Sequence, residues 1–75
     1  MEKIPLRLRI LHYLERNDGW INGGEIERLA MSAGYKASNA SRRCRELYEM
    51  KLIERREDKS VWYRAKRKIE QLSLV

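Results

Sequence analysis

Residues 37–56 read ASNASRRCRELYEMKLIERR, and this stretch decides the fold expected for the chain. Ala40, Cys44 and Leu47 recur at the i, i+4, i+7 spacing of a helical stripe that faces a core. At 100° per residue the opposite face carries Ser38, Arg42, Arg45 and Glu49, flanked by Ser41 and Glu46, with Asn39 and Arg43 at the edges. The stretch therefore predicts an amphipathic helix over about residues 38–50 whose outer face suits an anionic partner.

Two strands are predicted after this helix, over residues 52–57 and 61–65, joined by residues 58–60. Val61, Tyr63 and Ala65 alternate with Trp62 and Arg64, which is the period of a half-buried strand. The two runs predict an antiparallel hairpin. The connection Asp-Lys-Ser is not a favoured hairpin turn, so the turn geometry stays open.

The junction between the helix and the hairpin is formed by Met50, Lys51 and Leu52. Met50 and Leu52 are expected to complete the packing of the helix. Lys51 stands where a helix often ends in a glycine.

A first helix is predicted from Pro5, which suits the first helical position because its missing N–H costs nothing there. Its core stripe is Leu6, Ile10, Leu11 and Leu14, with Tyr13 at the edge. Leu8 lies off that stripe, either as an exposed leucine or in a dimer contact with Ile4. The helix should end around residues 17–19, where Gly19 can adopt a left-handed conformation.

A second, short helix of about two turns should follow a stub of strand at Trp20 and Ile21. Asn22 is placed to cap this helix, and Glu25, three residues later, to complete a capping box. Its core residues are Ile26, Leu29 and Ala30, and it should close near residues 33–34. Ser38 is the expected N-cap of the third helix.

The composition excludes several classes of protein. With 75 residues there is room for one domain, and no apolar run approaches the roughly 20 residues that span a bilayer. A single cysteine forms no internal disulfide and no metal cluster, so we expect an intracellular, cytoplasmic protein without a metal or other cofactor. His12 has no partner at ligand spacing, and Glu25 and Glu27 do not share a helix face, so no catalytic group is evident. We expect neither an enzyme nor a small-molecule ligand.

The net charge of +6 is concentrated in one half of the chain. Residues 1–35 hold equal numbers of acidic and basic side chains, whereas residues 36–75 hold twelve basic and six acidic ones. Such concentration favours a surface that binds a polyanion.

The order helix, strand stub, helix, tight turn, helix, hairpin resembles a winged helix-turn-helix domain, an α+β fold that is mostly α. The likeness covers residues 5–65 and is most specific in ASRRCREL at 40–47, LIERR at 52–56 and VWYR at 61–64. These segments resemble the recognition helix and wing of small bacterial, archaeal and phage regulators, including MarR-like and ArsR-like proteins. Residues 66–75 remain as a basic, amphipathic tail, which either docks on the core or a second copy, or frays.

The resemblance implies sequence-specific binding of double-stranded DNA by a small transcriptional regulator, with the third helix in the major groove and the hairpin on the backbone or minor groove. The groove-facing residues it implies are Ser38, Asn39, Ser41, Arg42 and Arg45. The wing contacts it implies are Arg55, Arg56, Lys59 and Arg64. Lys36 suits a phosphate contact, and Arg43 either braces the helix or touches the backbone.

The chain departs from the sequence patterns of these families, and the differences narrow the prediction. ArsR-like metal sensors carry paired cysteines, whereas this chain has only Cys44, so metal sensing is set aside. Winged domains that read left-handed duplexes have an Asn and a Tyr at the positions of Ser41 and Arg45, and a proline pair in the wing. This chain lacks all three features, so binding of left-handed duplexes is not expected. A homodimer on a two-fold site would increase specificity, and the oligomeric state stays open.

Two alternatives remain. One is a winged-helix adaptor whose basic surface meets an acidic protein. The other is that the arginines form ion pairs within the helix instead of contacting DNA. Arg42 with Glu46 and Arg45 with Glu49 have the i, i+4 spacing of such pairs, each worth about 0.2–0.5 kcal/mol.

Overall fold

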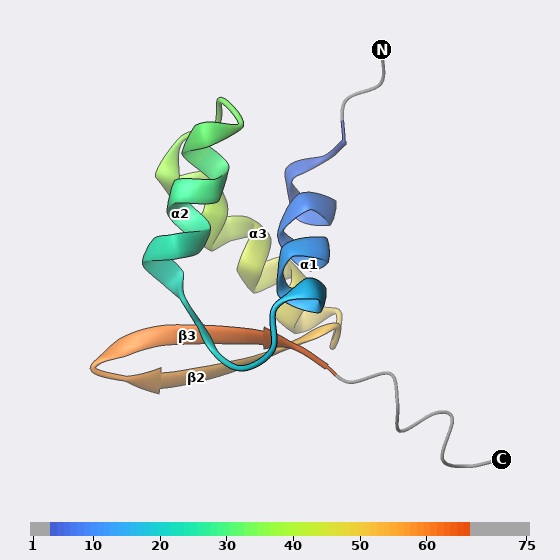
Figure 1. The fold of residues 1–75 in the computed structure, drawn as a ribbon, viewed down its shortest axis with the longest axis vertical. Helices are drawn as coiled ribbons and strands as arrows, with labels where there is room; N and C mark the ends of the chain where they lie inside the picture. Colours follow the sequence, from blue (N-terminus) through green and yellow to red (C-terminus); the bar gives the residue numbers. More distant parts are fainter. Residues whose placement is uncertain (1–3, 67–75) are drawn as a thin grey trace, which may run out of the picture.

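The computed structural model describes residues 4–66, which form three helices and a three-stranded antiparallel sheet (Figure 1). In chain order the elements are α1 (Leu6–Arg16), β1 (Ile21–Asn22), α2 (Gly23–Ser32), α3 (Ala37–Glu49), β2 (Ile53–Asp58) and β3 (Ser60–Ala65). The predicted α+β class, mostly helical, is confirmed. The helices gather on one side of the β2–β3 hairpin, whose turn extends away from α1. The tail predicted from residue 66 lies outside the described residues from residue 67 onward.

The core is a single cluster to which every helix and the sheet contribute. Its members are Leu6, Ile10, Leu14, Ile26, Ala30, Ala40, Cys44, Leu47, Ile53 and Tyr63. The predicted stripes of all three helices are therefore confirmed, with Leu11 and Leu29 packed at the margin. No polar or charged side chain is buried among residues 4–66, so apolar packing holds these elements together. Within the same residues, no helix has the length and apolar character needed to cross a membrane.

Helix α1 begins one residue later than predicted. Pro5 has extended backbone angles, and its carbonyl accepts hydrogen bonds from the N–H groups of Leu8 and Arg9, both at 3.0 Å. Pro5 is therefore the residue before the helix rather than its first member. The helix ends at Arg16, and Gly19 takes a left-handed conformation with φ 84° in the loop that follows.

Asn22 links the sheet to α2. Its side-chain Oδ1 accepts a hydrogen bond from the Gly24 N–H at 2.8 Å, which confirms the predicted cap, while its backbone pairs with Trp62 in β3. Glu25, expected to complete a capping box, accepts a hydrogen bond from the Tyr13 hydroxyl at 3.1 Å. That bond joins α1 to α2.

Helix α2 has ten residues, more than the two turns expected, and ends in a Schellman motif. The Gly34 N–H bonds to the Met31 carbonyl at 3.0 Å, and the Tyr35 N–H bonds to the Ala30 carbonyl at 2.9 Å. Gly34 has φ 93°, a conformation that only glycine adopts without strain. Tyr35 is thereby held against the core.

Helix α3 begins at Ala37, and the prediction that Ser38 caps it is wrong. Lys36 is the N-cap, without a side-chain capping bond, and Ser38 lies inside the first turn. The hydrogen bond from the Tyr35 N–H to the Ala30 carbonyl fixes Tyr35, and Ala37 is already half-buried. The loop between α2 and α3 therefore spans only residues 33–36. Ser38 is left with its side chain exposed.

The end of α3 turns through Lys51, which has φ 65°. The Lys51 N–H bonds to the Tyr48 carbonyl at 3.0 Å and the Leu52 N–H to the Leu47 carbonyl at 3.1 Å, a second Schellman motif with lysine in the usual glycine position. Because the chain reverses here, Ile53 enters the core at 1% exposure. Met50 and Leu52 are 52% and 39% exposed, so the prediction that they complete the packing is wrong.

The sheet has the strand order β1–β3–β2. The predicted hairpin is confirmed, with Glu57 opposite Val61 and Arg55 opposite Tyr63. Tyr63 is 8% exposed and contributes to the core, as the alternation predicts. Lys59 makes the turn with φ 64°.

Replacing Lys51 by glycine should stabilise the fold. A left-handed conformation costs an L-residue about 1–2 kcal/mol, and part of the relief is lost to the greater chain entropy of glycine. We expect Lys51→Gly to raise the free energy of unfolding by about 0.5–1 kcal/mol in urea denaturation. Lys51→Ala, which removes the same side chain but keeps the strain, should give no such gain, and equal effects from both variants would contradict this explanation.

Candidate functional site

The outer face of α3 is the surface that the sequence predicted. Ser38, Arg42 and Arg45 are exposed on the side opposite the buried stripe, and Ser41 is exposed at the flank of that side. Asn39 and Arg43 are half-buried at the edge near α1, where they border a hollow together with Pro5, Leu6, Arg7 and Tyr35. Lys36 is exposed just before the helix begins.

Glu46 turns toward α1 rather than toward Arg42. Its Oε1 lies 3.0 Å from Arg43 Nη1 and 3.5 Å from Arg7 Nη1. The predicted alternative pair between Arg42 and Glu46 is therefore wrong, because α1 supplies a competing cation that sequence spacing does not reveal. Arg43 takes the bracing role that was one of its two predicted roles.

The outer cations of α3 are left without counterions. Within residues 4–66, no ion pair is formed by Lys36, Arg42, Arg45 or Lys59. The alternative pair between Arg45 and Glu49 is absent from the same set. Arg42 and Arg45 can thus take up an external anion without first breaking an internal pair.

A groove of about 420 Å³ separates α3 from the hairpin. It is lined by Ser41, Arg45, Tyr48, Glu49, Arg55, Val61 and Tyr63. Arg55 lies opposite Tyr63 in the sheet, on the side that faces α3, and its Nη2 is 3.7 Å from Glu57 Oε1. The groove therefore brings three predicted site residues together, Ser41, Arg45 and Arg55.

The pKa of the Tyr63 hydroxyl is affected by the arginines that line this groove. Burial raises the pKa of Tyr63 above its ordinary value, and the guanidinium groups of Arg55 and Arg45 oppose part of that rise. The phenol stays neutral at physiological pH. The two arginines, from different elements, act on the same point.

Tyr48 is a groove residue that the sequence reasoning missed. Its side chain is 49% exposed and lines the groove beside Arg45 and Arg55. A phenol here can donate a hydrogen bond to an anion or stack on a sugar or base. The available signal was its position three residues after Arg45, on the edge of α3 shared with Ser41.

Arg56 and Arg64 lie on the other face of the sheet. Their guanidinium carbons are 5.0 Å and 4.5 Å from the centre of the Trp20 ring, and Arg64 also pairs with Glu54. Trp62, opposite Arg56, donates a hydrogen bond from Nε1 to the Asp58 carbonyl at 3.4 Å. The structure therefore separates these two predicted wing contacts from α3, while Lys59 lies at the hairpin turn.

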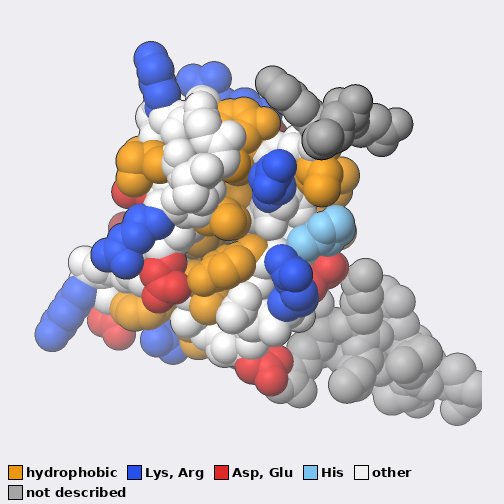
Figure 2. Space-filling view, turned by 45° about the horizontal axis from the view of Figure 1, so that its top comes forward, with side chains coloured by type: hydrophobic (Ala, Val, Ile, Leu, Met, Phe, Trp, Pro, Cys, Tyr) orange, Lys and Arg blue, Asp and Glu red, His pale blue; other side chains and the backbone are white. Residues whose placement is uncertain are grey.

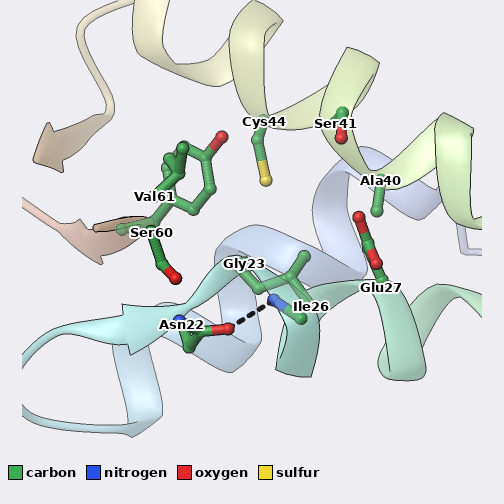
Figure 3. A pocket seen from close by; sticks show the side chains of 11 residues that line it. Asn22, Gly23, Ile26, Glu27, Ala40, Ser41, Cys44, Ser60 and Val61 are labelled. Atoms are coloured by element: carbon green, nitrogen blue, oxygen red, sulfur yellow. Dashed lines mark hydrogen bonds between the residues drawn. The ribbon is translucent and has the colours of Figure 1, made fainter. Parts of the chain in front are cut away.

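A second hollow, of about 270 Å³, lies between the start of α2, α3 and β3 (Figure 3). Cys44 points into it from α3, Glu27 approaches from α2, and Ser60 and Val61 stand at its β3 side. Its described lining contains one carboxylate, that of Glu27, and no Lys or Arg. The lining of this hollow therefore offers an anion no basic side chain.

The side that carries α1 and α2 differs from the outer face of α3. Figure 2 shows Lys and Arg side chains mixed with Asp and Glu over this side, with hydrophobic atoms exposed between them. The mixture agrees with the zero net charge of residues 1–35. It gives this side no continuous basic surface.

Cys44 is a buried free thiol in the described part of the chain. Burial raises the pKa of the Cys44 thiol to about 12, so the nucleophilic thiolate is scarcely populated at neutral pH. Within residues 4–66 there is no group of three or more His, Cys, Asp or Glu side chains that could hold a metal ion.

Comparison with models of protein families, with curated proteins and with solved structures finds no match to this chain.

Removing the Trp20 ring should destabilise the sheet. A contact between an arginine and an aromatic ring is worth about 0.5–1 kcal/mol near the surface, and the half-buried Trp20 makes two. We expect Trp20→Leu, which keeps an apolar side chain, to lower the free energy of unfolding by about 1–2 kcal/mol in urea denaturation followed by circular dichroism. A loss that persists unchanged when Arg56 and Arg64 are both replaced by methionine would contradict this explanation.

The Cys44 thiol should resist modification in the folded protein. At pH 8 a thiol with a pKa of about 12 is protonated and buried, so reaction with a disulfide reagent should await unfolding. We expect slow labelling in buffer and complete labelling within minutes in concentrated urea. Rapid stoichiometric labelling of the native protein would show that the thiol is not enclosed as described.

Proposed function

We propose that this protein binds double-stranded DNA as a winged helix-turn-helix transcriptional regulator, with α3 in the major groove. The observation that carries the proposal is the outer face of α3, where Arg42 and Arg45 are exposed and form no ion pair within residues 4–66. Glu46, the carboxylate four residues after Arg42 on the helix, is held by Arg43 and Arg7.

The arrangement of the elements supports this proposal. Helix α3 packs on the core through its buried stripe, and its ion pair with α1 lies at one edge of the helix, so the side opposite the stripe can approach a partner. An α-helix with side chains is about 10–12 Å across, and the major groove of B-form DNA is about 12 Å wide. The β2–β3 hairpin beside α3 forms the wing, placed to follow the neighbouring backbone.

The charges also support a duplex over an acidic protein. Lys36, Arg42 and Arg45 extend along α3, and Arg55 and Lys59 continue the series on the hairpin. Regularly spaced phosphates match such an extended series, and each contact releases condensed counterions. Lys36 and Ser38 lie at the positive end of the α3 dipole, which favours a phosphate there.

The two faces of the sheet are assigned different roles in this proposal. Arg55 and Lys59 are the wing contacts, because Arg55 shares the groove with α3 and Lys59 lies at the hairpin turn. Arg56 and Arg64 chiefly support the sheet through Trp20. No cofactor is needed for such binding.

Gel-shift titrations on random duplex DNA at several salt concentrations would test the proposal. We expect log affinity to fall linearly with log salt, and Arg42→Ala and Arg55→Ala each to weaken binding and lower the slope by about 1 where a phosphate contact is lost. Arg9→Ala is the matched control, since Arg9 is an exposed arginine on α1 without an ion pair in the described structure. It should change neither quantity.

Absence of binding at about 50 mM salt would reject the proposal in favour of the adaptor, because non-specific association with DNA is strong at low salt. Equal losses from Arg9→Ala and Arg42→Ala would show that net charge, rather than the face of α3, accounts for the affinity.

A further inference from the structure

Four side chains form a nearly straight line along the outer face of α3. At 100° per residue Ser38, Arg42, Arg45 and Glu49 fall within about 60° of one another, and the helix rises about 1.5 Å per residue along that line. Arg42 and Arg45 are thus about 4.5 Å apart along the axis, and Glu49 lies about 6 Å further on. All four are exposed. This line is referred to below as the reading stripe.

We infer that the reading stripe selects duplexes that present guanines to Arg42 and Arg45 and a cytosine to Glu49. This inference rests on the proposed function and deepens it. In the major groove guanine offers two acceptors, N7 and O6, to which an arginine binds bidentately. Cytosine offers the N4 amino group, a donor that a carboxylate accepts.

Glu49 is the informative member of the stripe. Its carboxylate lies on the same face as two unpaired arginines, yet within residues 4–66 it forms no ion pair with them or with any other cation. Near phosphates a carboxylate is repelled, so it lowers affinity for most sequences. The repulsion is offset only where a base supplies a donor.

The other bases fit a carboxylate less well. Guanine and thymine present the acceptors O6, N7 and O4, which repel it, and adenine places the acceptor N7 beside its N6 donor. Cytosine is the one base that presents a donor and no acceptor of its own in the major groove. Glu49 therefore lowers the affinity for duplexes without the cytosine more than it raises the affinity for duplexes that contain it. Repulsion of the wrong partner in this way increases specificity.

Selection from a pool of randomised duplexes, followed by sequencing, tests this inference with the full chain. The wild-type protein should enrich two guanines and one cytosine at fixed spacing. Glu49→Gln should exchange the cytosine for adenine, because glutamine binds adenine N6 and N7 bidentately, with a change of about 5- to 150-fold in the preference for cytosine over adenine. Arg42→Gln should exchange one guanine for adenine in the same way.

Asp18→Asn is the control, because it removes one exposed negative charge from the loop after α1 and should leave the selected sequence unchanged. Circular dichroism of each variant confirms folding. Binding without base preference, or a uniform gain in affinity for all sequences with Glu49→Gln, would overturn the inference while leaving the proposed function intact. Failure of the wild-type protein to bind any duplex would reject the proposed function itself.

Discussion

Ala40, Cys44 and Leu47 pack into one cluster with residues of α1, α2 and the sheet, and each is only 1% exposed. This burial fixes the rotation of α3 about its own axis. A rotation by one residue, 100°, would expose part of the stripe and bring Ser41 or Arg45 toward the core, at a cost of several kcal/mol for a buried unpaired charge. The exposure of Arg42 and Arg45 is therefore a consequence of apolar packing on the other side of the helix.

The pairing of Glu46 shows how the rest of the fold then determines the electrostatics of that face. Spacing along α3 suggested Arg42 as the partner of Glu46, four residues away, although Arg43, three residues away, is within reach on the same helix. The approach of α1 places Arg7 at the edge where Arg43 lies, and one carboxylate serves both. The bond between Arg7 and Glu46, which lie 39 positions apart in the sequence, thus leaves Arg42 without an ion-pair partner within residues 4–66. The sequence around Arg42 does not reveal this.

Periodicity predicted the elements and their buried faces because burial is repeated along many residues of each helix. The single-residue features were harder to predict. Ser38 did not cap α3, because the fixed position of Tyr35 starts the helix two residues earlier, with Lys36 as the N-cap. Met50 and Leu52 stayed exposed because the left-handed turn at Lys51 redirects the chain, and a lysine gives no sequence signal for that turn. The stacking of Arg64 on Trp20 depends on the path of the loop that begins at residue 17 and returns to the sheet. The sequence around Trp20 and the sequence around Arg64 do not predict that path.

The division of the hairpin arginines follows from the period of a strand. Successive side chains point to opposite faces, so the burial of Ile53 and Tyr63 places Arg55 on the side of α3 and Arg56 on the side of Trp20. Two adjacent arginines with the same charge therefore have different environments, one in a groove beside Arg45 and one over an aromatic ring. Composition alone counts them together, whereas the register of the sheet separates a residue available to a partner from one that stabilises the sheet. Within residues 4–66 the contact surface proposed above therefore consists of one helix face and one side of the hairpin.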